Sequence, residues 1–136
     1  MPTVRAISLH QPWASMIAEG KKKIETRRWP TRFRGPILIC STKKPEGQGP
    51  TGMALAMAKV STCRKMKQAD VTDTKCEVYH GAYSWVLTNV KALKKPFPVS
   101  GKQGLYFLTT DNAEVTSYYE KHKIKNKKKE PKGYYG

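Results

Sequence analysis

The sequence predicts an α+β, mainly β fold: a small barrel of five to six mostly antiparallel strands, with a helix after the first strand and a C-terminal helix. Two observations predict it. Short β-branched or apolar runs recur along the chain and are separated by turn-forming residues. Helical spacing of apolar residues follows the first strand and returns only near the C-terminus. A closed barrel is favoured because closure leaves no exposed strand edge.

The strand patterns differ in kind. Residues 3–9 are β-branched and apolar, and residues 36–42 form the continuous apolar run of a strand buried on both faces. Residues 21–29 alternate, with one charged face. Residues 53–63 alternate weakly, and their small, unbranched side chains would also permit a helix. The predicted strands span residues 3–9, 21–29, 36–42, 53–63, 82–93 and 104–109.

Each predicted helix has its own start signal. Pro12 suits a first helical turn, because its missing N–H costs nothing there. Trp13, Met16 and Ile17 then share one face, and Gly20 is a typical helix end. Asp111 is the expected N-cap of a second helix that runs to about residue 123. Pro96 and Pro98 are expected to end the fifth strand, and residues 64–81 to form a loop with a short helical piece.

The charge is strongly positive. The chain of 136 residues has 26 Lys and Arg against 10 Asp and Glu, a formal net charge of +16. Residues 1–44 carry +8, residues 121–136 carry +6, and the region between them carries only +2. A field of this size attracts polyanions. We therefore predict one folded domain over residues 1–120, a Lys-rich basic tail over residues 121–136, and a nucleic-acid partner.

Cysteine and histidine residues are few and dispersed. Neither the three Cys nor the three His have the close spacing of a metal site, so we expect no metal and no cofactor. No stretch approaches the roughly 20 apolar residues of a membrane span. We expect a monomeric, intracellular, cytoplasmic protein that is not bound to a membrane.

Three motifs lie close together in the first third of the chain. Gln11-Pro12-Trp13-Ala14 begins the first helix, residues 20–27 follow the pattern Gly-x-Lys-x-x-Glu-x-Arg, and Arg34-Gly35 forms a turn. In combination they resemble the ASCH domain family (activating signal cointegrator homology), a PUA-like β-barrel module, from about residue 4 to residue 109. One departure is Tyr106, where the family suggests a larger aromatic residue. The resemblance implies binding of RNA or a nucleotide in a cleft.

The same residues suggest how such a cleft works. Trp13 offers a stacking surface, Gln11 an amide for a base edge, and the strand face of Glu25 and Arg27 a set of charges. Trp13 is equally compatible with the core, and Glu25 with Arg27 could form a purely structural pair. Lys21 and Lys22 are expected to be solvated, whereas alternation places Lys23 on the Glu25 face. The predicted nucleic-acid-binding residues are Gln11, Trp13, Lys23, Glu25, Arg27, Arg32, Arg34, Lys43 and Lys44.

Two enzymatic alternatives follow from the resemblance. Some small members of the family deacetylate N(4)-acetylcytidine with a Lys-x-x-Thr pair and a later Glu, which implies Lys23, Thr26 and Glu77 here. Their odd spacing requires an irregular strand, because Lys23 and Thr26 would otherwise face opposite sides. Other members cut RNA, for which Lys43 or Lys44 are candidates, although no pair of His supports this. Binding of single-stranded RNA or a modified nucleoside without turnover is the preferred hypothesis, with DNA as a further possible ligand.

Overall fold

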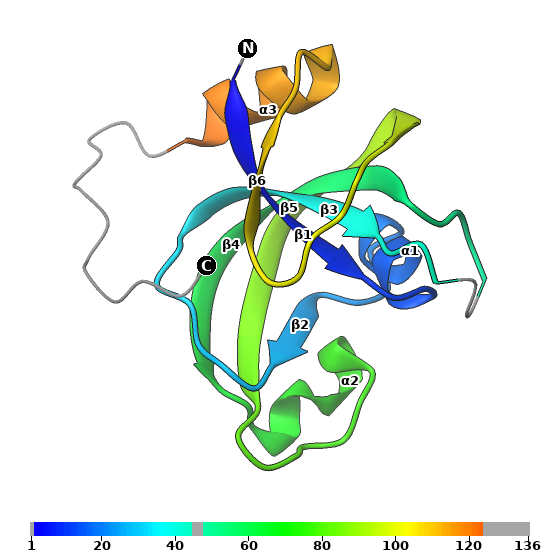
Figure 1. Cartoon of the computed structure of the whole chain (residues 1–136). Coiled ribbons are helices and arrows are strands. Elements are labelled where there is room, and N and C mark those ends of the chain that lie inside the picture. Colours follow the sequence, from blue (N-terminus) through cyan, green and yellow to red (C-terminus); the bar gives the residue numbers. More distant parts are fainter. Residues whose placement is uncertain (1, 45–47, 124–136) are drawn as a thin grey trace.

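The computed structural model describes residues 2–44 and 48–123, and its centre is one strongly curved sheet of six strands (Figure 1). The strands follow the order β2-β5-β4-β3-β1-β6. β1 and β3 are parallel and the other four neighbouring pairs are antiparallel. The strands are β1 (Thr3–Leu9), β2 (Ile24–Arg27), β3 (Gly35–Ser41), β4 (Met53–Lys65), β5 (Tyr83–Pro98) and β6 (Tyr106–Thr109).

This architecture confirms the predicted α+β class and the mostly antiparallel strands. Closure into a barrel is not observed: within the described residues, β2 pairs only with β5 and β6 only with β1, so the curved sheet stays open between them. The two edge strands are short, with four residues each. Because the edge strands are short, an open sheet leaves few unpaired backbone N–H and C=O groups at its edges.

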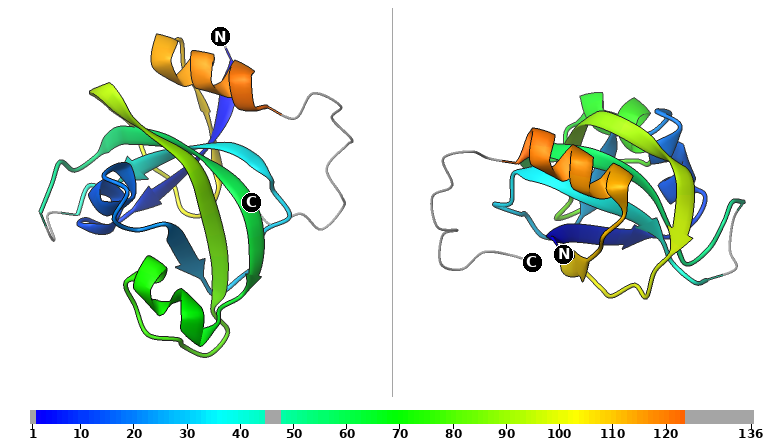
Figure 2. Two further views of the ribbon diagram at one scale, coloured as in Figure 1. Left: turned by 180° about the vertical axis from the view of Figure 1, so that it is seen from behind. Right: turned by 90° about the horizontal axis from the view of Figure 1, so that it is seen from above.

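The sheet has a hydrophobic core on each face. Ile37 and Ile39 of β3 pack with α1 (Trp13–Ala18) on one side. Leu38 and Cys40 alternate with them and pack on the other side with α3 (Ala113–His122). The period of two along β3 therefore explains its continuous apolar run, because both of its faces are covered. Figure 2 shows α1 and α3 on different sides of the curved sheet.

Two predicted strand ends were wrong for local reasons. Residues 21–23 lie in the connection between α1 and β2, where the backbone N–H groups of Lys21 and Lys22 both donate to Met16 O, after Gly20 at φ 78°. β2 therefore begins only at residue 24. β5 continues through both prolines to Pro98, paired with β4. Proline is tolerated there because β2 pairs only with the first part of β5, which leaves the other edge of this stretch unpaired.

The predicted cap of the last helix was one residue early. Asn112, not Asp111, is the N-cap, and its side-chain oxygen accepts a hydrogen bond from Val115 N at 3.1 Å. The helix ends at residue 122, two residues beyond the predicted domain boundary. The rest of the predicted basic tail, residues 124–136, lies outside the described residues.

Tyr106 stands where the family pattern suggests a larger aromatic residue. It is nevertheless buried, and its hydroxyl lies 2.7 Å from Ser8 Oγ.

The segment between β4 and β5 contains a 3₁₀ turn (Gln68–Asp70) and α2 (Val71–Thr74), as the predicted short helical piece suggested. The segment lies beside β2 in Figure 1. Buried Asp70 accepts hydrogen bonds from both terminal nitrogens of Arg64, from Ser84 Oγ and from Lys67 N. No described helix is long and apolar enough to cross a membrane.

Candidate nucleic-acid interface

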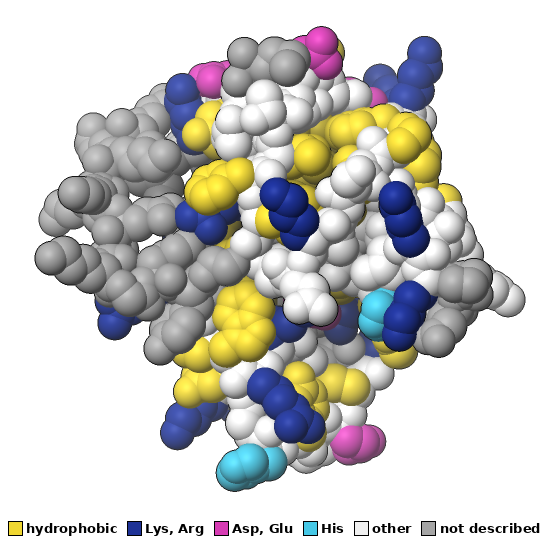
Figure 3. Space-filling view, in the orientation of Figure 1, with side chains coloured by type: hydrophobic (Ala, Val, Ile, Leu, Met, Phe, Trp, Pro, Cys, Tyr) yellow, Lys and Arg dark blue, Asp and Glu magenta, His cyan; other side chains and the backbone are white. Residues whose placement is uncertain are grey.

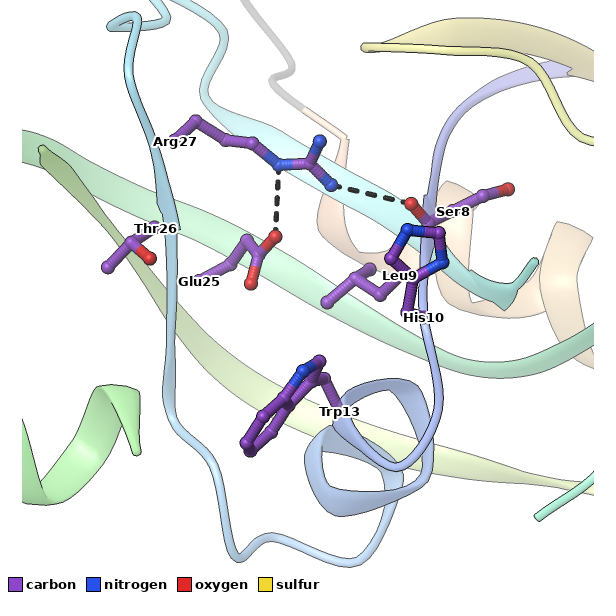
Figure 4. Close-up of a pocket in the computed structure, with 7 residues that line it drawn as sticks. All are labelled: Ser8, Leu9, His10, Trp13, Glu25, Thr26 and Arg27. Atoms are coloured by element: carbon purple, nitrogen blue, oxygen red, sulfur yellow. Dashed lines mark hydrogen bonds and ion pairs between the residues drawn. The ribbon is translucent and has the colours of Figure 1, made fainter. Parts of the chain in front are cut away.

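A pocket of about 190 Å³ lies where the end of β1, the start of α1 and the strand β2 meet (Figure 4). Two motifs that are separate in the sequence therefore line one cavity. β1 and the turn after it supply one wall, α1 supplies an aromatic ring, and β2 supplies charged groups. The lining residues are Ser8, Leu9, His10, Trp13, Glu25, Thr26 and Arg27.

Trp13 is a wall of the pocket and not a core residue. Trp13 is 38% exposed, whereas Ala14 and Ile17 of the same helix are buried. Trp13 is the first residue of α1, so its ring lies at the end of the helix that faces β2. Trp13 therefore lines the pocket and is not part of the hydrophobic core cluster that Ala14 and Ile17 join.

Glu25 and Arg27 form the predicted pair and also line the pocket. Arg27 Nε donates to Glu25 Oε2 at 2.9 Å, and Arg27 Nη2 reaches Ser8 O at 3.4 Å. The guanidinium thus bridges β2 and β1, as Figure 4 shows. Neighbours two apart on a strand point to the same face, which is why both side chains enter the cavity.

Lys22 differs from its prediction as a solvated residue. Its side chain is only 4% exposed, and Nζ donates to Thr74 O at 2.6 Å and lies 3.6 Å from Glu25 Oε1. Burial lowers the pKa of Lys22, although the charge of Glu25 acts in the opposite direction. The pattern Gly-x-Lys-x-x-Glu-x-Arg places its Lys at this position, so motif spacing was a better guide than strand alternation. Alternation failed because residues 21–23 are not part of a strand.

The residues implied for deacetylation are not gathered in one place. Lys23 and Glu77 are exposed, and neither lines the pocket. Thr26 does line it, but its side chain points to the other side of β2 from Glu25 in Figure 4. Thr26 Oγ1 lies 3.8 Å from Cys76 Sγ. The structure therefore brings together Trp13, Glu25 and Arg27, but not Lys23, Thr26 and Glu77.

Gln11 has a structural role in place of the predicted reading of a base edge. It is buried, and its amide nitrogen donates to Ser15 Oγ and to Pro50 O, both at 2.7 Å. Its Oε1 accepts a hydrogen bond from Ser15 N at 2.9 Å. These three contacts occupy the amide and fix the first turn of α1, and with it the position of Trp13.

The remaining predicted cations lie outside the pocket. Arg32, Lys43 and Lys44 are exposed, whereas Arg34 Nη1 donates to the carbonyls of Thr31 and Phe33 in its own turn. Figure 3 shows Lys and Arg side chains spread over the face seen in Figure 1, with few acidic side chains among them.

His10 is a pocket residue that the sequence interpretation missed. It follows β1 directly, and its Nδ1 lies 2.9 Å from Thr42 Oγ1. Its place beside the Gln-Pro-Trp motif was the available signal. Neither His80 nor His122 lines the pocket. Among the described residues, no three His, Cys, Asp or Glu side chains gather where they could hold a metal ion.

Family comparison agrees with this arrangement. The family model of the ASCH domain matches residues 7–97, about two thirds of the chain. The chain belongs to the ASCH-domain family.

Relatives of this ASCH domain include activating signal cointegrator 1 of Homo sapiens, with 49% identity over 43 residues, and that of Mus musculus, with 46%. Each match covers 31% of this chain but only 7% of the relative, so this chain corresponds to a small part of those proteins. The solved structure of ASCH from Zymomonas mobilis has a TM-score of 0.62 at 17% identity, and covers 86% of this chain and 93% of that one. A mutant of the same protein has a TM-score of 0.61 at 19% identity, with 83% and 93% covered. At this identity, the likeness supports the fold alone.

Proposed function

We propose that this ASCH domain binds single-stranded RNA without turnover and holds one base in the pocket against Trp13. The observation that carries the proposal is the exposed Trp13 ring, which shares a cavity with the Glu25–Arg27 pair. Bases of single-stranded RNA are free to stack on aromatic rings and to offer their pairing edges. Stacking of one base contributes about 1–3 kcal/mol.

The charged residues indicate separate places for the base and for the phosphate groups. The Glu25 carboxylate in the pocket only accepts hydrogen bonds, as phosphate oxygens do, so the phosphate groups belong outside the pocket, beside exposed cations such as Arg32, Lys43 and Lys44. The net charge of +16 supplies the long-range attraction and a steep salt dependence. DNA shares the phosphates and the stacking but lacks the 2′-OH, so a DNA strand of the same sequence is the natural competitor.

The test is fluorescence anisotropy of a labelled ten-nucleotide RNA with Trp13→Ala. Loss of one stacked base should weaken binding by roughly 5- to 150-fold, while the slope of log Kd against log salt is unchanged. Phe107→Ala is the matched control, because Phe107 is 61% exposed but does not line the pocket. A folded Trp13→Ala protein that binds RNA as tightly as the wild type would refute the proposal.

Neutralising the exposed Lys43 and Lys44 should change a different quantity, the slope of log Kd against log salt. Lys43→Gln with Lys44→Gln should weaken binding to RNA of any sequence and reduce the salt slope by about 1.4, or roughly 0.7 for each lost phosphate contact. An unchanged salt slope would place the phosphates elsewhere on the molecule.

Deacetylation of N(4)-acetylcytidine is the second candidate, and one observation favours it. Buried Lys22, whose pKa is lowered, lies 3.6 Å from the pocket carboxylate of Glu25. The Glu25 carboxylate can take a proton from the attacking water and pass the same proton to the leaving amine, and Lys22 lies close enough to tune the basicity of that carboxylate. Lys22 is thus better placed than Lys23 to assist a reaction in the pocket. The alternative set of Lys23, Thr26 and Glu77 would have to converge on the substrate, and these three side chains lie apart in the structure.

Mass analysis of an RNA that contains one N(4)-acetylcytidine separates the alternatives. Deacetylation that is lost in Lys22→Met but kept in Lys23→Ala would favour the hydrolase centred on Lys22. The reverse pattern would favour the set of Lys23, Thr26 and Glu77. Shortened fragments would indicate a ribonuclease, and an unchanged RNA leaves the binding module as the function.

A further inference from the structure

We propose that the pocket selects guanine and reads its Watson–Crick edge with the carboxylate of Glu25. This inference rests on the proposed function, because it assumes that a base stacks on Trp13. It adds the identity of that base and names Glu25 as the residue that determines specificity.

The carboxylate restricts what can enter the pocket. The Glu25 side chain is only 13% exposed and lines the cavity between Trp13 and Arg27 (Figure 4). An ionised carboxylate only accepts hydrogen bonds, and each of its oxygens has two lone pairs. Whatever part of a ligand meets it must therefore donate. Phosphate and carbonyl oxygens are excluded from that position because they too only accept hydrogen bonds.

Glu25 retains unused accepting capacity. Its Oε2 takes one hydrogen bond from Arg27 Nε at 2.9 Å. Its Oε1 lies 3.6 Å from Lys22 Nζ, which is an ion pair longer than a hydrogen bond. The two cations stabilise the ionised carboxylate, and at least one lone pair on each oxygen remains for a ligand.

Guanine fits this acceptor better than the other bases do. Its N1–H and N2–H donate side by side, which matches the two oxygens of a carboxylate. Cytosine and adenine place an acceptor nitrogen beside their amino group, and uracil places a carbonyl on each side of N3–H. The O6 carbonyl of guanine, next to N1–H, would lie on the side of the Arg27 guanidinium, which is a donor.

The size of the pocket agrees with one base. Its volume of about 190 Å³ is below the roughly 300–1,000 Å³ of sites for drug-sized ligands, so a base enters while sugar and phosphate stay outside. Trp13 by itself stacks with any base, because every base has a π-face. Selectivity must therefore come from the polar groups, and Glu25 is the acceptor among them.

The experiment measures Kd for five-nucleotide RNAs that differ only at the central position, within flanking uridines. Guanine should bind at least about tenfold more tightly than cytosine, adenine or uracil. Inosine, which lacks the N2 amino group, should weaken binding about tenfold, as expected for one hydrogen bond to a charged acceptor. 7-Deazaguanine keeps the Watson–Crick edge and should bind like guanine.

Glu25→Gln should reduce the preference for guanine to below about threefold, because one of its two polar atoms becomes a donor. Glu19→Gln is the matched control: it removes the same charge from an exposed position and should keep the preference. Thermal melts monitored by circular dichroism show whether each variant is folded. If Glu25→Gln fails to fold, inosine and 7-deazaguanine on the wild-type protein decide.

The outcomes separate the two proposals. If no RNA binds in a manner that depends on Trp13, the proposed function itself fails. If binding depends on Trp13 but all four bases bind equally, or inosine equals guanine, only the selection of guanine is overturned. Weaker binding of 7-deazaguanine would also overturn it, since the Hoogsteen edge would then be the one recognised.

Discussion

Asp70 holds the segment between β4 and β5 in place, and Asp70→Ala should release it. The carboxylate accepts four hydrogen bonds: 2.6 and 2.8 Å from Arg64, 2.9 Å from Ser84 Oγ and 2.9 Å from Lys67 N. The segment also supplies Thr74 O, the partner of Lys22 behind the pocket. Loss of Asp70 should therefore reduce stability and loosen the pocket wall.

The magnitude follows from burial. Removal of one partner from a buried charged pair costs about 3–5 kcal/mol. Arg64 is 35% exposed and regains water, so the lower end, about 3 kcal/mol, applies. For a domain of this size, each kcal/mol lowers Tm by about 4 °C, so Tm should fall by about 12 °C.

The effect also depends on pH. The Arg64 guanidinium, with help from Lys67 N and Ser84, holds the pKa of Asp70 well below its ordinary value of 3.8. A depressed carboxyl pKa contributes stability that is present above the unfolded pKa and lost as pH falls through the folded one. The wild-type Tm should therefore decrease below pH 4 more steeply than that of Asp70→Ala.

Circular dichroism melts at pH 7 and from pH 5 to pH 2 measure both quantities. Arg64→Ala should cost less than Asp70→Ala, because Asp70 keeps Ser84 and Lys67 as donors. The reasoning is refuted if Asp70→Ala lowers Tm at pH 7 by less than about 3 °C, since the four contacts would then carry little free energy.

Three further predictions concern the last helix, the core and the tail. Asn112→Ala should cost about 1 kcal/mol in urea unfolding, because it removes the cap on Val115 N, whereas Asp111→Ala should cost almost nothing; equal costs would contradict the assigned cap. Burial raises the pKa of Cys40 to about 11, so the folded state holds a proton that the unfolded state loses above pH 9. Tm should thus fall more steeply from pH 9 to pH 11 in the wild type than in Cys40→Ala, and parallel curves would exclude this thiol as the cause. Deletion of residues 124–136 removes five Lys and should weaken RNA and DNA binding alike, with the salt slope reduced by up to about 3.5; selective loss of one nucleic acid would contradict a nonspecific electrostatic role.

The sequence by itself determined the features that depend on local spacing. Alternation and apolar runs predicted the strands and the α+β class, because a strand must match the two faces it covers. The motifs around residues 11–14 and 20–27 identified the family and three pocket residues, Trp13, Glu25 and Arg27. Those two motifs come together because α1 is short and only residues 19–23 separate it from β2.

Only the tertiary structure decided the features that depend on distant partners. Lys22 is buried because Thr74 O, 52 residues further along the chain, accepts a hydrogen bond from its Nζ. Gln11 is occupied because Pro50 O, 39 residues away, meets its amide. The open sheet likewise results from where β2 and β6 find their partners. Local periodicity contains no information on such contacts, since a polar side chain is buried only where the folded chain supplies a partner for its hydrogen bonds.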